Sequence, residues 1–202
     1  MKMNKKYVTQ TMLLALAAFG VAVTSADVNA AHPKRMVLPA GSSSNGTDAG
    51  GTCGTPTAFA ATPFNDTGDT TGAANVISSI ATGCSDYSTV AGPEAIYSFV
   101  AGTGASVTFN VAGTTTLDPS IYLVTTCNSG ATCVTGADYN YGPGTAETFT
   151  ASALTAGTTY YLHIDSYYGT GDPAPYNTYS QGPYTLAVTG TLPVSLQEFT
   201  ID

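Results

Sequence analysis

Acidic residues in turn-forming stretches are the first candidates for chemistry in this sequence of 202 residues. Calcium prefers several oxygen ligands from carboxylates, amides and loop carbonyls. Two stretches offer them, and they predict calcium as a cofactor, with Asp66 and Asp69 as ligands in one and Asp165 and Asp172 in the other. Both stretches look flexible, and their crowded negative charge would be relieved by a cation. Asp and Asn are also common turn residues, so ordinary turns are the alternative.

Tyrosines outside the predicted strands are the second candidate site. Tyrosine offers a rigid amphipathic contact face at low entropic cost, which suits a neutral glycan or another protein's surface. The predicted ligand-binding residues lie in stretches rich in Gly, Asn, Ser and Pro, and they are Tyr139, Tyr141, Tyr167, Tyr168, Tyr176 and Tyr179. The same rings could instead fold over the open edge of a β-sandwich and complete its core, and the sequence leaves both interpretations open.

Catalytic residue patterns are absent from the sequence. His163 is the only histidine in the globular part, so a Ser-His-Asp hydrolase would have to combine it with Asp165. Strand alternation over residues 159–165 argues against this, because it places His163, Asp165 and Tyr161 together on a face expected to be exposed to solvent. The sequence also contains no G-x-S-x-G elbow, metalloprotease helix or phosphate loop. We therefore predict that the protein is not an enzyme.

Four cysteines, Cys53, Cys84, Cys127 and Cys133, predict two disulfides, because exported chains fold in an oxidising compartment. Cys127 and Cys133 flank a turn-rich segment that could close as a hairpin loop. We therefore expect them to pair, which leaves Cys53 to pair with Cys84. The spacings lack a C-x-x-C pair, and no histidine lies near them in sequence, which argues against zinc.

The amino-terminal residues have the pattern of a secretory signal. Three lysines among the first six residues precede an apolar run over residues 12–23 that is too short to span a bilayer. Cleavage is expected after Ala30, with Ala26 as the alternative. We therefore predict a secreted protein, extracellular or on the surface of a bacterium, without direct membrane insertion.

The distribution of charge limits the partners. The formal net charge is −8, and every Lys and Arg lies at or before Arg35. Nucleic acids and anionic membranes are bound mainly by Lys and Arg, so neither is an expected partner. Neutral surfaces and cations remain.

Composition and residue alternation predict an all-β fold. The length left after the signal, about 170 residues, suits a single domain, and abundant Gly, Thr, Ser and Val favour short strands over helices. Period-two alternation is clearest at residues 107–111 and 184–188. Further strands are expected at residues 95–101, 120–125, 148–151, 159–165 and 194–201. This spacing is typical of an antiparallel β-sandwich of about eight or nine strands.

The predicted domain organisation has four parts. Residues 1–30 form the signal peptide, and residues 31–52 form a flexible Gly/Ser-rich leader with too few apolar residues to bury. Residues 53–190 form the β-sandwich, and residues 191–202 form an edge strand or tail.

The order of several motifs resembles the bacterial pre-peptidase C-terminal domain, over roughly two thirds of the chain. The motifs include Gly92-Pro-Glu-Ala-Ile-Tyr-Ser-Phe99, Asp118-Pro-Ser-Ile-Tyr-Leu123, Leu154-Thr-Ala-Gly-Thr-Thr-Tyr-Tyr-Leu-His-Ile-Asp165 and Gly182-Pro-Tyr-Thr-Leu-Ala-Val188. The resemblance implies a jelly-roll-like β-sandwich that is usually appended to secreted proteases and other surface enzymes. Such domains are non-catalytic and are credited with substrate or surface binding and sometimes with calcium sites. Glu94 stands where that family often has Asp.

Together these observations predict a secreted, non-catalytic binding module for extracellular polysaccharide or protein surfaces, with calcium stiffening its loops. The alternative is a structural or assembly subunit. In that case, the leader or the terminal strand of one copy would complete the sheet of another by strand addition, and the protein would self-associate.

Overall fold

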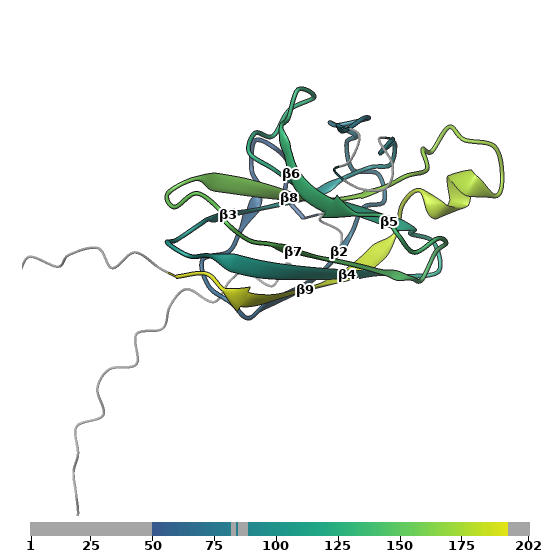
Figure 1. Ribbon diagram of the computed structural model, residues 1–202. Coiled ribbons are helices and arrows are strands. Elements are labelled where there is room, and N and C mark those ends of the chain that lie inside the picture. The colour runs from purple at the N-terminus through teal and green to yellow at the C-terminus, as the bar shows by residue number, and fades with distance from the viewer. Residues whose placement is uncertain (1–49, 82–83, 85–88, 194–202) are drawn as a thin grey trace, which may run out of the picture. The chain divides into compact units, whose positions relative to one another are not determined.

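The computed structural model describes residues 50–81, 84 and 89–193, which form a sandwich of two β-sheets (Figure 1). In chain order the elements are β1 (Thr57–Ala58), β2 (Phe64–Asp69), β3 (Ala95–Val100), β4 (Ser106–Gly113), β5 (Pro119–Val124), β6 (Cys133–Ala137), β7 (Ala146–Ala151), β8 (Thr159–Ser166), the 3-10 helix η1 (Tyr176–Tyr179) and β9 (Pro183–Thr191). The predicted all-β sandwich is confirmed. The signal peptide, residues 31–49 of the leader and the strand at residues 194–201 lie outside the described residues.

The chain passes between the two sheets at almost every connection. One sheet has the order β1-β3-β8-β5-β6 and the other β2-β9-β4-β7. Among the described strands, β5 and β6 are the only consecutive pair in one sheet. Strands β1 and β3 are parallel, and all other pairings are antiparallel. This connectivity brings loops that are distant in sequence to the same end of the sandwich.

No helix in the described part of the chain is long and apolar enough to cross a bilayer.

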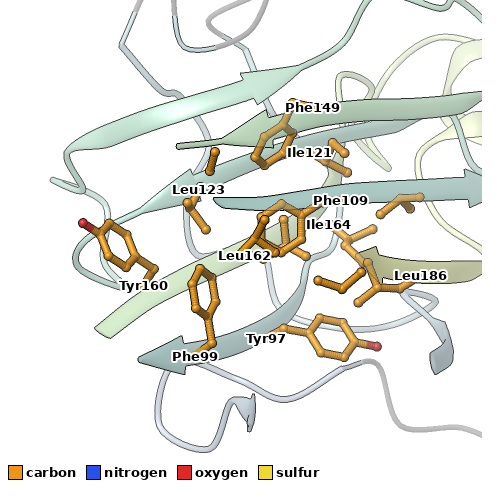
Figure 2. Close-up of a cluster of buried hydrophobic side chains, with 14 of the residues drawn as sticks. Tyr97, Phe99, Phe109, Ile121, Leu123, Phe149, Tyr160, Leu162, Ile164 and Leu186 are labelled. Carbon is orange, nitrogen blue, oxygen red and sulfur yellow. The ribbon is translucent and has the colours of Figure 1, made fainter. Parts of the chain in front are cut away.

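The core between the sheets is built from the alternating residues that the sequence predicts. Val107, Phe109 and Val111 of β4 are fully buried, whereas the intervening Asn110 is exposed. The ring centroid of Phe109 lies 5.1 Å from that of Phe149 on β7. Figure 2 shows the aromatic and aliphatic side chains of both sheets meeting in this layer. Removal of this apolar surface from water is the main favourable contribution to folding.

The five-stranded sheet is also covered on its other face, which we call its outer face. Residues 74–81, 84 and 89–91, here the covering segment, contribute Ile77 and Val90 to a second buried apolar cluster. Tyr122 and Val124 of β5 point into the same cluster. As a result, every residue of β5 is buried. Where the sheet is covered on both faces, its outward polar side chains are buried as well.

Two disulfides are present, but the predicted pairing is wrong. Cys53 is bonded to Cys127, with the Cα atoms 5.4 Å apart, and Cys84 is bonded to Cys133, with a Cα separation of 5.8 Å. Cys133 begins β6 and packs with Cys84 against the second cluster, whereas Cys127 lies beside His163. The two cysteines of the hairpin therefore reach different partners. Each disulfide closes a long loop, which the chain-entropy model credits with about 4 kcal/mol.

Candidate functional site

Two loops that are far apart in sequence meet at one end of the sandwich. Residues 138–145 connect β6 to β7, and residues 167–182 connect β8 to β9. Asp118, just before β5, joins them. Its carboxylate Oδ2 accepts a hydrogen bond from the backbone N–H of Gly142 at 3.0 Å, and its own N–H donates to the carbonyl of Tyr179 at 3.0 Å. We call this end, with its six predicted tyrosines, the tyrosine end.

The backbone of the β6–β7 loop is hydrogen-bonded to a carboxylate on β7. The buried carboxylate of Glu147 accepts hydrogen bonds from the backbone N–H groups of Tyr139 and Asn140 at 3.0 and 2.6 Å. Gly142 and Gly144 have φ angles of +98° and +80°, a region that favours glycine. The Glu147 carboxylate thus anchors the loop at Tyr139 and Asn140.

The β8–β9 loop gathers its tyrosines around Tyr168. The ring of Tyr176 stacks on it with centroids 5.0 Å apart, and the rings of Tyr167 and Tyr179 meet it edge-on at 5.2 and 6.2 Å. Partial burial raises the pKa of the Tyr168 hydroxyl, and the nearby negative charge of Asp118 adds to this shift. The four rings form a contiguous aromatic surface on one loop, which Figure 1 shows projecting with η1 from one end of the sandwich.

The six rings differ in how far they are exposed. Tyr141, Tyr139 and Tyr176 are 68%, 53% and 48% exposed. Tyr167 and Tyr179 are half-buried, as is the central Tyr168. None of the six rings is fully buried.

The first predicted calcium cluster is part of a strand. Asp66 and Asp69 belong to β2, which pairs with β9 along its length, so the expected flexible turn is wrong. The carboxylate of Asp66 accepts hydrogen bonds from the backbone N–H of Thr67 at 2.8 Å and from the Tyr97 hydroxyl at 3.1 Å. Asp69 caps the backbone N–H of Thr71 at 2.8 Å. Both acids therefore already bind groups of the protein.

The second predicted calcium cluster is divided between a buried and an exposed acid. Asp165 is fully buried in β8, whereas Asp172 is exposed and accepts a hydrogen bond from the backbone N–H of Gly169 at 2.8 Å. Within residues 50–81, 84 and 89–193, no group of three His, Cys, Asp or Glu side chains is placed to hold a metal ion.

Calcium binding therefore stays a prediction, in which loop carbonyls and water would supply most of the ligands. Binding to the native state alone stabilises it by mass action, so we expect millimolar calcium to raise the melting temperature by about 2 °C. A chelator should reverse the rise, as measured by scanning calorimetry. Identical melts in calcium and in chelator would show that these four acids serve only the two strands and the turn in which they lie.

His163 and Asp165 are buried, so their predicted position on a solvent-exposed face is wrong. They do lie opposite the inter-sheet core, as the alternation predicts, but the covering segment shields that face. His163 Nδ1 lies 2.7 Å from Glu94 Oε2, and the imidazole stacks on the ring of Tyr122 with centroids 5.0 Å apart. The Tyr122 hydroxyl donates to Asp165 Oδ2 at 3.0 Å. We call Glu94, Tyr122, His163 and Asp165 the buried quartet.

Glu94 links this quartet to the covering segment. Its Oε1 accepts hydrogen bonds from the backbone N–H groups of Val76, at 2.9 Å, and of Ile77. Its Oε2 faces His163, the only basic side chain after Arg35. A buried carboxylate is tolerated when it is paired and hydrogen-bonded. Sequence reasoning missed this role. The available signal was an acid beside a predicted strand, in a part of the chain where His163 is the only basic side chain after Arg35.

The charge of Asp165 is disfavoured where it lies. Burial raises the pKa of its carboxyl well above the usual value, and the negative charge of Glu94 adds to this, against hydrogen bonds from Ser166, Tyr122 and Gly92 that lower it. Burial likewise raises the pKa of Tyr122 far above that of a free tyrosine. The quartet is thus a structural network without access to solvent, and it offers no support for a hydrolase that uses His163 with Asp165.

Comparisons with known proteins leave the family of this chain open. No family model matches it, and no curated protein matches it. A similar solved structure is the pre-peptidase C-terminal domain of a collagenase from Bacillus anthracis, with 13% sequence identity, a TM-score of 0.40, and coverage of 65% of this chain and 92% of that chain. These values are too low to show a shared family, so the resemblance seen in the sequence stays a prediction.

Proposed function

We propose that this protein is a secreted, non-catalytic binding module that holds an uncharged extracellular polysaccharide through the tyrosine end. One observation carries the proposal. Six tyrosines from two loops that are distant in sequence lie together at one end of the sandwich, and the rings of Tyr139, Tyr141 and Tyr176 are about half exposed or more.

The chemistry of this end favours a neutral ligand. Tyrosine rings offer flat apolar faces for stacking, and their hydroxyls both donate and accept hydrogen bonds. The charges near Tyr168 are the carboxylates of Asp118 and Asp138, and no Lys or Arg follows Arg35. An anionic ligand would be repelled, whereas the hydroxyl-rich rings of a neutral sugar polymer would not.

Exposed tyrosines from both loops should be needed for binding. Replacing Tyr141 and Tyr176 together by Ala is expected to weaken retention on the cognate polysaccharide at least about tenfold, because each ring contributes roughly 1 kcal/mol to contact. The melting temperature should stay within about 3 °C of wild type, because exposed rings add little to the core. A glycan array identifies the polysaccharide, and affinity electrophoresis or titration calorimetry then measures the change.

Two controls define the outcome. Val100 is 56% exposed at the other end of β3, so Val100→Ala should leave binding unchanged. The double substitution of Tyr141 and Tyr176 by Phe should keep most of the affinity, because it keeps the stacking faces. Binding that weakens steeply with added salt would point to a charged ligand and contradict the proposal.

The assembly alternative gives a different set of results. A protein that binds no polysaccharide on the array but self-associates in sedimentation experiments would favour strand addition. A protein that retains another protein through Tyr141 and Tyr176, and no glycan, would keep the binding site and change the class of ligand.

A further inference from the structure

One of the two disulfides lies against the only basic side chain of the sandwich. Cys127 Sγ is 3.5 Å from Nε2 of His163, whose Nδ1 lies 2.7 Å from the carboxylate of Glu94. The order of groups is therefore sulfur, imidazole and carboxylate. This arrangement stabilises a thiolate, because an imidazolium that is held by a carboxylate can donate its second N–H to sulfur.

The two disulfides differ in their surroundings. Cys84 is 7% exposed and lies in the second apolar cluster, into which Cys133 also packs. Cys53 and Cys127 are both half-buried, as is Cys133, so Cys84 is the one cysteine of the four that is buried. A thiol reagent therefore meets a half-buried cysteine at either sulfur of the Cys53–Cys127 bond, but at only one sulfur of the Cys84–Cys133 bond. Apolar burial also disfavours the thiolates that opening of the Cys84–Cys133 bond would create.

We propose that the Cys53–Cys127 bond is a thiol–disulfide exchange site for an external dithiol, with Cys127 as the leaving sulfur and His163 as the group that receives it. This activity is separate from glycan binding. Asp118 of the tyrosine end precedes β5, whereas Cys127 follows the opposite end of that strand.

The exchange proceeds in two balanced steps. A thiolate of the external dithiol attacks Cys53 Sγ, a bond forms between these two sulfurs, and the bond between Cys53 and Cys127 breaks. Its electron pair remains on Cys127, whose thiolate accepts a hydrogen bond from the imidazolium Nε2–H of His163. The second thiol of the dithiol then attacks the reagent's own sulfur in the mixed disulfide, which closes a disulfide within the reagent. Cys53 is released and takes up the proton that this second thiol loses. The dithiol is oxidised by two electrons, and the protein disulfide is reduced.

The groups around His163 bring no positive charge close to its ring. Glu94 faces its Nδ1 from the segment before β3, Tyr122 stacks on the ring from β5, and Cys127 approaches Nε2 from the β5–β6 loop. Asp165 lies two residues further along β8 on the same face, where it binds the Tyr122 hydroxyl. All the ionisable neighbours are acids or neutral groups, and the chain has no Lys or Arg after Arg35 to repel the imidazolium.

The order in which the disulfides open tests the proposal in the native full-length protein. During timed exposure to dithiothreitol, free thiols are trapped with an alkylating reagent and located by peptic digestion and mass spectrometry, since trypsin has no site after Arg35. We expect the Cys53–Cys127 bond to open at least about tenfold faster than the Cys84–Cys133 bond. Equal rates, or faster opening of Cys84–Cys133, would overturn the proposal.

A substitution separates the effect of His163 from simple access. His163→Gln keeps a polar side chain but removes the cation, so opening of Cys53–Cys127 should slow about tenfold while that of Cys84–Cys133 is unchanged. Near-ultraviolet circular dichroism checks that the variant is folded. A folded variant with an unchanged ratio of the two rates would show that exposure alone explains the difference and would overturn the role of His163.

A trapping experiment on the wild-type protein does not depend on that variant. Glutathione, a monothiol, cannot complete the second step and therefore leaves a mixed disulfide. We expect glutathione on Cys53, with Cys127 recovered as the alkylated thiol. Glutathione found on Cys127, or shared equally between the two, would show that Cys127 is not the preferred leaving sulfur.

Discussion

Replacing Glu94 by Ala is expected to lower the free energy of unfolding by about 3–5 kcal/mol, one of the largest effects of any single substitution in this chain. The variant would leave the backbone N–H groups of Val76 and Ile77 without their acceptor, and His163 without its carboxylate. All of these groups are buried or partly buried, so water cannot readily replace Glu94. Urea denaturation at neutral pH, followed by circular dichroism, measures the change.

A matched acidic residue provides the control. Asp172 also accepts a backbone hydrogen bond, from Gly169, but it is exposed. Asp172→Ala is expected to lower the free energy of unfolding by less than about 1 kcal/mol, because water can replace the lost acceptor. Similar losses for the two variants would show that Glu94 does not anchor the covering segment to the sheet.

The second large effect is a dependence of stability on pH that originates at Asp165. Because burial raises the pKa of this carboxyl in the folded state, the native protein keeps a proton there that the unfolded chain has released. Stability therefore falls as the pH rises above the value for an unfolded Asp, about 4, until the folded-state pKa is passed. Each extra proton held by the native state contributes a slope of up to about 1.4 kcal/mol per pH unit.

Asp165→Asn removes this titration and keeps the shape of the side chain. The amide oxygen can accept from the backbone N–H groups of Gly92 and Ser166, as Oδ1 does now, and the amide nitrogen can donate to the Tyr122 hydroxyl. Relative to wild type, we expect the variant to gain stability as the pH rises from about 4.5 to about 8. Urea titrations across this range measure the difference.

The same substitution at Asp118 is the comparison. Burial also raises the pKa of that carboxyl, against one hydrogen bond from Gly142 that lowers it. The burial is less complete than at Asp165, so Asp118→Asn should produce a shallower trend of the same sign. If the stabilities of Asp165→Asn and wild type ran parallel over the whole range, Asp165 would be ionised in both the folded and the unfolded state.

Local residue patterns determined much of the fold. The alternation at residues 107–111 and 184–188 predicts which side chains enter the core, and Val107, Phe109 and Val111 are fully buried. Composition alone excluded a helical domain. Such features depend on neighbours two residues apart on one strand, so they can be read from the sequence directly. Strand β2 was missed because Asn65 to Asp69 has turn-forming residues, and its strand geometry comes from pairing with β9.

Contacts between distant segments decided the disulfides. Cys127 and Cys133 are close in sequence, but one is bonded to Cys53 and the other to Cys84. The sequence shows which cysteines are present and how many pairings are allowed. Which sulfurs meet depends on packing between distant segments, which are 74 residues apart for Cys53–Cys127 and 49 residues apart for Cys84–Cys133.

Alternation along β8 shows which of its residues share a face, whereas what covers that face depends on tertiary packing. Alternation correctly grouped His163 with Asp165, but the covering segment and Glu94 come from a distant part of the chain and bury them. The six tyrosines were likewise recognisable as loop residues, whereas their convergence required Asp118 to bind both loops. Periodicity is a property of one strand, while burial and convergence are properties of contacts between strands and loops, which no single stretch of sequence contains.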